Sequence, residues 1–515
     1  MKFKVFFYAL IISLIINLPY LMGLILTPED SQYLHYTASV NNYDQLYSID
    51  CFHQGMHRIF KTINLYSTEK ERFKRFAPFY PFCGFVFKSA GFNIDYGFTL
   101  LRIVSTIIFI SVLYYSLTVF LEGAEIWRCL LFILFSGCFY YVSYIDTNTF
   151  LSIYLHPHLA ISLSLVLLIL SRYYKLEARS KMQDARCARQ ETRTQQNLNL
   201  ALLCCCIFVL SFVHTYMLIP VILFCLIYCS FLKRSLIPLL FTILFSSPGI
   251  IYHFYTTYLS YTKPEFHFKS AYIFPNLFIT FGLYGLPFFL AIYFWFTTDG
   301  RSLLKNNKIL RFCSVWFFVF FILSFVPLYF GRRFVISTHM ALSIMGFVFI
   351  EKKLLPNRKI IASFLIFLAV LPTLFFYARQ FYNITLNKNS YYISSKENNI
   401  IKYLRNYYRS HPKLMCSEYS GMLYPPFTGC TAFSSGWEFT SFWVSKKEII
   451  NIFYSPKTDN ETRKNILRKY NIKFVLYTPN ETGPRPEPWP DLSGFLEPVI
   501  DENKYKLFLF TENIN

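Results

Sequence analysis

Charged residues are scarce in this chain. Only 15% of its 515 residues are Asp, Glu, Lys or Arg, whereas soluble proteins carry about 25%. The 13 cysteines form no CxxC pair and most of them lie in apolar runs, so a zinc site is not expected. A Walker loop, a GxGxxG fingerprint and a basic–aromatic RNA motif are also missing. These absences argue against a soluble protein that binds nucleotides, zinc or RNA.

Long apolar runs fill the chain instead. The sequence is 54% hydrophobic, and apolar runs of about 20 residues can each cross a hydrocarbon core of roughly 30 Å. Two helices rather than one are needed within residues 198–232, with the break at His214-Thr215-Tyr216. We predict an α-helical polytopic membrane protein with about eleven transmembrane helices, at residues 5–26, 98–120, 129–145, 152–171, 198–214, 216–232, 236–252, 274–296, 312–329, 334–350 and 360–378.

The net charge of +21 follows the predicted loops rather than a nucleic-acid-binding surface. Lysines and arginines gather in the loops assigned to the inner side, at residues 172–193, 233–234, 301–308 and 352–359. The short loops assigned to the outer side hold only Lys263, Lys269, Arg332 and Arg333. By the positive-inside rule the N-terminus is cytoplasmic, and the odd number of helices places the C-terminal tail outside.

The predicted outer side carries two large segments. Residues 27–97 form a long loop, and residues 379–515 are more polar and predict a small α/β domain behind a transmembrane domain at 1–378. Within the tail we expect helices at 397–408 and 459–470 and strands at 473–477 and 505–510. Cys51 with Cys83, and Cys416 with Cys430, are two pairs that an oxidising compartment would allow to bond; the sequence leaves this open.

Two adjacent carboxylates, Glu29 and Asp30, directly follow the first apolar run. Carboxylates at membrane depth are costly and usually serve a function. Just past the hydrocarbon, a proton acceptor would meet both lipid and water. The alternative is that Pro28 and the two acids only end a helix and begin a solvated loop.

Further polar residues fall on or near the predicted outer side. All ten histidines do so, at positions 35, 53, 57, 156, 158, 214, 253, 267, 339 and 411. We interpret this as one polar cavity that opens outward, because ionisable residues inside a membrane usually mark function. The alternative is that outer loops are simply richer in polar residues. The residues expected to line the cavity are Tyr33, His35, Asp146, His156 and His158.

Arg332 and Arg333 lie in a short outer loop, against the usual charge bias. Paired arginines can hold a phosphate through bidentate hydrogen bonds; the alternative is that they reach toward lipid headgroups. For His156-Pro157-His158 we do not expect metal binding, because a His-x-His pair at a helix start points its rings to different faces.

Taken in order, these motifs resemble those of the GT-C superfamily of membrane glycosyltransferases, which includes protein O-mannosyltransferases, aminoarabinose transferases and oligosaccharyltransferase catalytic subunits. The opening Pro28-Glu29-Asp30-Ser31-Gln32-Tyr33 resembles that of bacterial members, with the tyrosine one place earlier. Gly331-Arg332-Arg333-Phe334 is similar to the motif that opens a late helix, and residues 436–440 and 463–477 are similar to the tail. The resemblance favours a bacterial inner membrane over the endoplasmic reticulum. The next outer loop holds only Asp146 where the family has a second acidic pair, so no cofactor is predicted and a divalent metal stays an alternative.

The resemblance implies transfer of a sugar, with inversion, from a polyprenyl-phosphate carrier to a glycan, lipid or protein acceptor on the outer face. Such a reaction needs a base and a cationic site, and we expect Asp30 to be the base, with Glu29 second, and Arg332 and Arg333 to stabilise the departing phosphate. A transporter or flippase of a lipid-linked or anionic substrate is the alternative, although paired hydropathy repeats are missing. A third reading is an assembly protein whose outer domain binds partners.

Overall fold

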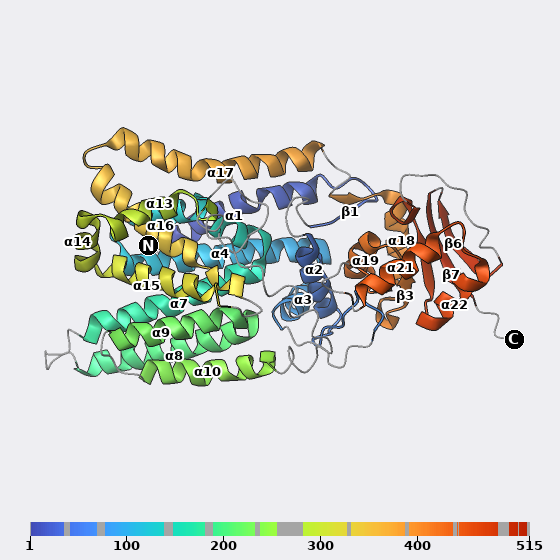
Figure 1. Ribbon diagram of the computed structural model, residues 1–515, viewed down its shortest axis with the longest axis horizontal. Coiled ribbons are helices and arrows are strands. Elements are labelled where there is room, and N and C mark those ends of the chain that lie inside the picture. Colours follow the sequence, from blue (N-terminus) through green and yellow to red (C-terminus); the bar gives the residue numbers. More distant parts are fainter. Residues whose placement is uncertain are drawn as a thin grey trace. The chain divides into compact units, whose positions relative to one another are not determined.

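A computed structural model of the protein describes most of the chain: residues 2–35, 42–69, 78–137, 148–180, 189–231, 237–254, 282–326, 331–386, 391–435, 440, 442–482, 494–502 and 504–511. Helices dominate it, and among the described residues every strand except β1 (Gln32–Tyr33) lies beyond residue 391 (Figure 1). The chain divides into two compact units. Unit 1 consists of Met1–Pro19 and Leu100–Asn383, and unit 2 of Tyr20–Thr99 and Ile384–Asn515. The division falls inside α1, α4 and α17.

Unit 1 is built from apolar helices. Five described helices are long and apolar enough to cross a membrane, or six if α14 and α15, which are bent by 104° at Asn307, count as one span. Four shorter apolar helices lie within α8, α9, α10 and α13, and the count of eleven spans stays a prediction. The helices are α1 (Lys2–Ile25), α4 (Ile94–Phe120), α5 (Glu125–Phe135), α6 (Thr149–Leu155), α7 (Pro157–Ser180), α8 (Arg189–Val213), α9 (Leu218–Phe231), α10 (Ile237–Phe254), α13 (Leu286–Phe296), α14 (Thr298–Asn306), α15 (Lys308–Leu323), α16 (Thr338–Phe349) and α17 (Lys359–Leu386).

Two helix breaks in unit 1 bear on the site. The predicted break at residues 214–216 is confirmed, since α8 ends at Val213 and the 3₁₀ turn η3 (Thr215–Met217) precedes α9. A second break, at His156, divides the predicted run 152–171 into α6 and α7. Pro157 causes it, because a residue before proline is driven out of the helical region. His156 is accordingly extended, with φ −132° and ψ 110°, and Pro157 takes the first position of α7.

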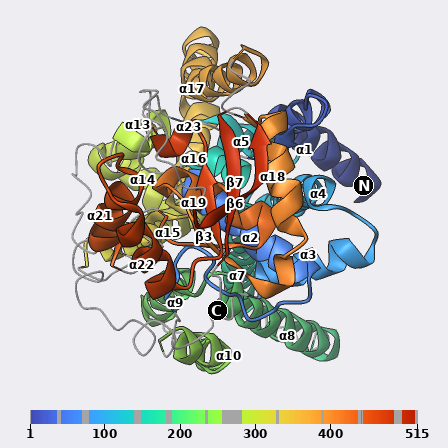
Figure 2. The same cartoon turned by 90° about the vertical axis from the view of Figure 1, so that its right-hand side faces the viewer.

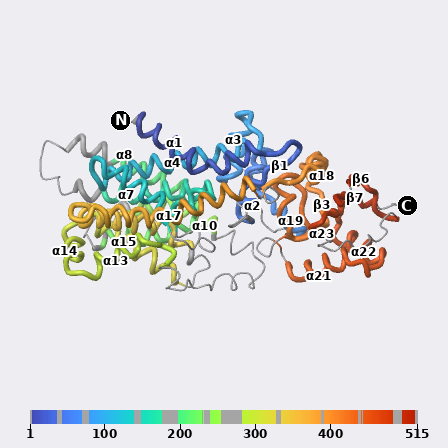
Figure 3. Tube along the Cα trace, turned by 90° about the horizontal axis from the view of Figure 1, so that it is seen from above, coloured from blue at the N-terminus to red at the C-terminus, as the bar shows by residue number. Residues whose placement is uncertain are grey.

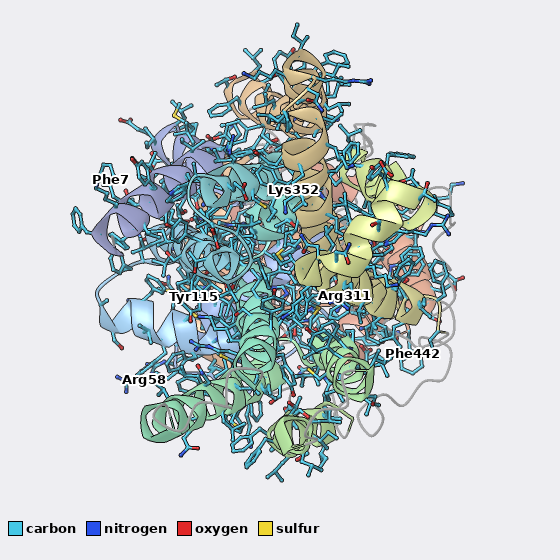
Figure 4. All side chains as sticks on the ribbon, turned by 90° about the vertical axis from the view of Figure 1, so that its left-hand side faces the viewer. Phe7, Arg58, Tyr115, Arg311, Lys352 and Phe442 are labelled. Carbon is cyan, nitrogen blue, oxygen red and sulfur yellow. The ribbon has the colours of Figure 1, made fainter. Side chains whose placement is uncertain are left out.

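Polar contacts tie the apolar helices of unit 1 together. Helix α1 runs alongside α4 (Figures 1 and 3), and the Ser13 hydroxyl donates to the Ile103 carbonyl at 2.9 Å. Basic side chains also pair with acids, as in Arg128–Glu351 at 3.2 Å and Lys353–Asp299 at 3.6 Å. Tyr115, Arg311 and Lys352 are labelled in Figure 4, and the Lys175 ammonium donates to the hydroxyl of Tyr115 at 2.9 Å.

Unit 2 contains a mixed five-stranded sheet in the order β4-β3-β5-β7-β6 (Figures 1 and 2). Strands β3, β4 and β5 are parallel, and β7 pairs antiparallel with both β5 and β6. The core packs Met415, Val475 and Phe508 of the sheet against Phe453 and Leu467 of two helices. The strands are β3 (Lys413–Met415), β4 (Thr431–Ala432), β5 (Phe474–Tyr477), β6 (Leu496–Glu502) and β7 (Tyr505–Phe510), and the helices of the tail are α18 (Ser395–Arg405), η8 (Tyr408–Ser410), α19 (Glu418–Leu423), α20 (Pro425–Thr428), α21 (Trp443–Tyr454), α22 (Asn460–Tyr470) and α23 (Pro479–Thr482).

The expected helices and strands of the tail are confirmed. Helix α22 starts at its predicted place because the Asp459 side chain accepts a hydrogen bond from the Thr462 amide at 2.7 Å, which satisfies a free N–H of the first turn. Ser394 caps α18 in the same way. Cys416 and Cys430 are not joined in a disulfide, nor are Cys51 and Cys83.

Residues 27–97, the predicted outer loop, fold together with the tail in unit 2. They contribute α2 (Asn42–Met56) and α3 (Phe79–Ser89). The buried Lys446 ammonium donates to Glu69 Oε2 at 2.5 Å and to the Phe433 carbonyl at 2.7 Å. The Ala432 amide donates to the Leu65 carbonyl at 2.8 Å. These contacts explain why residues 20–99 and 384–515 form one unit. The division into a transmembrane domain at 1–378, with the outer loop 27–97 included, and an extracytoplasmic domain at 379–515 stays a prediction.

Candidate active site

The carboxylates Glu29 and Asp30 lie on a short segment, residues 27–35, which we call the acidic loop. Helix α1 ends at Ile25, and the chain then turns, with the Ser31 amide donating to the Pro28 carbonyl at 3.1 Å. Asp30 has a left-handed backbone, with φ 61°, a conformation that non-glycine residues seldom adopt. Both acids are exposed. The turn therefore presents two carboxylates to solvent directly after an apolar helix.

Helix α18 of the tail contacts the acidic loop at Asp30. The Asn398 amide nitrogen donates to the Asp30 carbonyl at 2.6 Å. The Lys402 ammonium lies 3.3 Å from Asp30 Oδ1, and both side chains of this ion pair are more than half exposed. An exposed pair of this kind contributes little to stability, about 0–1 kcal/mol. Asp30 is thus fixed mainly by its backbone, and its carboxylate is available to another partner.

The other end of the acidic loop is buried. Gln32 and Tyr33 form β1, which pairs antiparallel with β2 (Tyr392–Ile393). The Tyr33 ring packs so tightly on α1 that a Cβ added at Gly23 would lie 2.4 Å from its hydroxyl. A glycine is therefore needed there. We expected Tyr33 to line a cavity; in the structure its ring packs on α1 and supports the acidic loop.

His35 closes the acidic loop onto α4. Its Nε2 lies 2.7 Å from Asp95 Oδ1, and the Gln32 amide nitrogen donates to the same oxygen at 2.7 Å. The His35 side chain is fully buried, and its backbone is left-handed with φ 55°. Asp95 was missed by the sequence reasoning, which began this helix at residue 98.

Helix α2 carries buried titratable groups in the same unit. Burial raises the pKa of Asp50 to about 7, against hydrogen bonds that include one from the Gln54 amide at 3.1 Å. Burial, helped by the charge of His57, lowers the pKa of His53 to about 3, and His53 Nδ1 donates to the Pro426 carbonyl at 2.7 Å. Burial also lowers the pKa of His57, whose ring stacks on Tyr408 at 3.9 Å between centroids. At neutral pH these histidines are uncharged.

Unit 1 gathers a second group of predicted residues, which we call the histidine–arginine cluster: His156, His158, His214 and Arg333, with Tyr216. The ring centroids of His156 and His158 are 5.5 Å apart, and those of His158 and His214 are 5.8 Å apart and stacked. The Arg333 guanidinium carbon lies 5.5 Å from the Tyr216 ring centroid, within reach of a cation–π contact.

Helix boundaries bring these rings together. The expectation that the rings of His156 and His158 diverge is wrong, because His156 precedes α7 in extended conformation instead of belonging to one helix with His158. His214 lies between α8 and η3, and Arg333 lies in the short turn η5 (Gly331–Val335). The Nδ1 atoms of His156 and His214 are buried, and in the described part of the chain neither finds a hydrogen-bond partner. Buried polar atoms usually have a partner, so these two suit a polar ligand.

Two predicted site residues are not placed. Asp146 lies outside the described residues, and so does the side chain of Arg332. Among the described residues no three His, Cys, Asp or Glu side chains gather to hold a metal ion, and Asp30 Oδ1 faces an ammonium group.

Known proteins match this chain in structure. No family model and no curated protein matches it. ArnT from Cupriavidus metallidurans bound to undecaprenyl phosphate is 11% identical, with a TM-score of 0.53 and 98% of each chain covered. The oligosaccharyltransferase AglB from Archaeoglobus fulgidus, in complex with an inhibitory peptide and a dolichol-phosphate, is 10% identical, with a TM-score of 0.52, covering 92% of this chain and 69% of that one. The apo form of the A. fulgidus oligosaccharyltransferase is 12% identical at a TM-score of 0.53 with the same coverage. At these identities the likeness shows the fold.

Proposed function

We propose that this chain, which has the fold of the GT-C membrane glycosyltransferases, transfers a sugar from a polyprenyl-phosphate carrier to a glycan, lipid or protein acceptor. The fold supports this class of reaction, and its neighbours ArnT and AglB hold undecaprenyl phosphate and dolichol-phosphate. The observation that carries the proposal is the acidic loop. It presents exposed carboxylates on a backbone that is held by Asn398 at Asp30, by the β1–β2 pairing and by the His35–Asp95 contact. Preorganised groups of this kind are what a catalytic base needs.

In the proposed reaction Asp30 is the base. Its carboxylate takes the proton of an acceptor hydroxyl, and the acceptor oxygen attacks the anomeric carbon of the sugar. The bond from that carbon to the phosphate oxygen breaks, the electron pair leaves with the phosphate, and the configuration inverts. The weak, exposed pair with Lys402 gives way to the acceptor hydroxyl at little cost. Glu29, next to it and exposed, assists by orienting the acceptor.

The histidine–arginine cluster is proposed to hold the donor phosphate. Arg333, oriented by the Tyr216 ring, supplies the positive charge, with Arg332 as its partner. The Nδ1 atoms of His156 and His214, which have no partner in the described residues, would bond to phosphate oxygens. His158, stacked on His214, keeps these rings in place.

Localisation follows from the charge pattern. We propose a multi-pass protein of a bacterial inner membrane with a cytoplasmic N-terminus and the tail outside. Protease added to the cytoplasmic side should cleave residues 172–197 and spare the tail. Cleavage of the tail from that side would contradict the orientation.

The test of the function is an assay of the purified protein in lipid with a panel of polyprenyl-phosphate sugars. Loss of sugar from the carrier, and a new glycosidic bond of inverted configuration on an acceptor, are expected. If sugar moves with its intact carrier across the bilayer and no bond is formed, the protein is a transporter or flippase. If neither occurs, the assembly role of the outer unit gains support.

A further inference from the structure

We infer that Asp95 is a positioning residue for the reaction: together with His35 and Gln32 it clamps the acidic loop onto the first turn of α4. This inference rests on the proposed function, since it assigns the clamp to the placement of Asp30. The three side chains all belong to unit 2 and meet at one oxygen atom of Asp95. His35 Nε2 and the Gln32 amide nitrogen both lie 2.7 Å from Asp95 Oδ1.

The clamp is buried where it meets the loop. The His35 side chain is fully buried and that of Asp95 is 24% exposed. Hydrogen bonds to a charged group in such surroundings are short and strong, and losing one partner leaves the other without compensation. The Thr99 hydroxyl lies 3.4 Å from His35 Nδ1, and the Tyr33 ring centroid lies 4.5 Å from that of His35. The imidazole is therefore held on both edges and one face.

The acidic loop contains strained backbone that the contacts of Asp95 help to hold. Asp30 and His35 are both left-handed, with φ 61° and 55°. Such residues persist only when their surroundings over-determine the conformation. The β1–β2 pairing fixes the middle of the loop, and Asn398 holds the Asp30 carbonyl. His35, the second left-handed residue, contacts Asp95 of α4 through its side chain, so Asp95 is placed to keep this turn in its conformation.

A matched control exists in the same unit. Asp50 on α2 is a buried carboxylate that accepts a hydrogen bond from the Gln54 amide, as Asp95 does from Gln32. Its side-chain hydrogen-bond partners, Gln54 of α2 and Tyr66, do not belong to the acidic loop. Asp50→Asn therefore removes a buried carboxylate from unit 2 and leaves the clamp intact.

The experiment compares Asp95→Asn, Asp50→Asn and wild type by turnover and by amide hydrogen exchange. For Asp95→Asn we expect kcat per folded molecule to fall about 10- to 100-fold with the donor KM unchanged, because a small misplacement of a catalytic group costs about this much. Exchange at the amides of Ser31 and Leu34, which donate to the Pro28 and Tyr391 carbonyls, should become about 10-fold faster without a change elsewhere. Asp95→Glu, which keeps the charge, should restore part of the turnover. Asp50→Asn should keep the exchange rates of the loop and kcat.

Two results would overturn the inference. One is Asp95→Asn with the kcat and loop exchange of wild type. The other is an equal loss of kcat in Asp50→Asn, which would mean that any buried carboxylate of the unit matters. If Asp95→Asn does not fold, Gln32→Met removes one of the two donors and should give the same pattern at about 3- to 10-fold; unchanged exchange there counts equally against it. If wild type shows no turnover at all, the proposed function fails, while the exchange rates still decide the clamp.

Discussion

The acidic loop and the histidine–arginine cluster are built in opposite ways. The loop keeps its charged groups in solvent and buries the side chains that support them, namely Tyr33 and His35. The cluster buries its functional rings: His156 and His214 are 4% and 8% exposed, and their Nδ1 atoms find no partner in the described residues. Each design is consistent with its proposed task. A base that exchanges a proton with an acceptor has to stay hydrated, whereas a group that binds phosphate gains strength away from water.

The two regions also differ in how their residues are held in place. The loop contains two left-handed non-glycine residues, and it is fixed by a hydrogen bond that His35 donates to Asp95 of α4 and by one that Asn398 of α18 donates to Asp30. The cluster has stacked rings and a cation over an aromatic face. Changes to the loop should therefore alter the rate of the chemical step, and changes to the cluster should alter donor affinity.

The largest expected effect comes from the proposed base. Asp30→Asn keeps the size of the side chain but removes its ability to take a proton, so kcat should fall about 10²- to 10⁴-fold. Glu29→Gln should cost less. The matched control is Asp501→Asn in the tail, because Asp501 is also an exposed carboxylate paired with a lysine, Lys506 at 2.9 Å. Turnover by Asp30→Asn at the level of Asp501→Asn would refute the assigned base.

The next effect concerns the cluster. Arg333→Ala should raise the donor KM about 5- to 150-fold, equivalent to roughly 1–3 kcal/mol for a charged hydrogen bond to phosphate. Arg333→Lys should restore only part of it, because the fork of the guanidinium is lost. Arg311→Ala, at an exposed arginine of α15 in the same unit, serves as the control and should keep the donor KM. An unchanged donor KM in Arg333→Ala would reassign that arginine to the lipid headgroups.

A smaller effect concerns the stability of the fold, which depends on pH through the buried Asp50. The pKa of buried Asp50 is raised from 3.8 to about 7, so its contribution to stability is full below pH 4 and is lost as the pH rises through 7. The contribution is on the order of 4 kcal/mol, at 1.36 kcal/mol per pKa unit. The thermal midpoint of Asp50→Asn relative to wild type should therefore increase from pH 5 to pH 8. A difference that stays constant over this range would show that Asp50 does not titrate.

His53 should behave in the opposite sense. Its pKa is lowered from 6.5 to about 3, so its contribution is full above pH 6.5 and is lost as the pH falls. The thermal midpoint of His53→Asn relative to wild type should increase as the pH falls from 7 to 4. The opposite slopes of the two variants are the check, since a general effect of pH on the fold would move both in one direction.

Regular elements of the tail were predictable from the sequence, and contacts over long distances were not. Helix α22 and strands β5 and β7 have clear spacing, and Asp459 marks where the helix starts. The β1–β2 pairing consists of two residues on each side, far apart in the chain, and carries no periodicity. The predicted break at residues 214–216 was correct, whereas the break before Pro157 was missed although the proline itself signals it.

The charged residues of the candidate site could be selected from the sequence, but the residues that hold them in place could not. Glu29 and Asp30 were chosen because carboxylates next to apolar runs are costly, and Arg333 because an arginine in a short outer loop opposes the usual charge bias. The first of these arguments also applies to Asp95, a carboxylate in the first turn of α4, but hydropathy placed the start of that helix after it. Lys402 and Asn398 were missed for a different reason. They belong to an ordinary amphipathic helix, and only the fold shows that α18 contacts Asp30.

One paired measurement tests whether the acidic loop carries the chemical step and the histidine–arginine cluster binds the donor. Donor affinity, by equilibrium binding of a polyprenyl-phosphate sugar, and the single-turnover rate of sugar release are measured on Asp30→Asn and Arg333→Ala in lipid. The account predicts wild-type affinity with a rate reduced at least 10²-fold for Asp30→Asn. For Arg333→Ala it predicts weakened affinity, with a rate at saturating donor that falls far less than in Asp30→Asn. Loss of donor affinity in Asp30→Asn together with an unchanged single-turnover rate would contradict it.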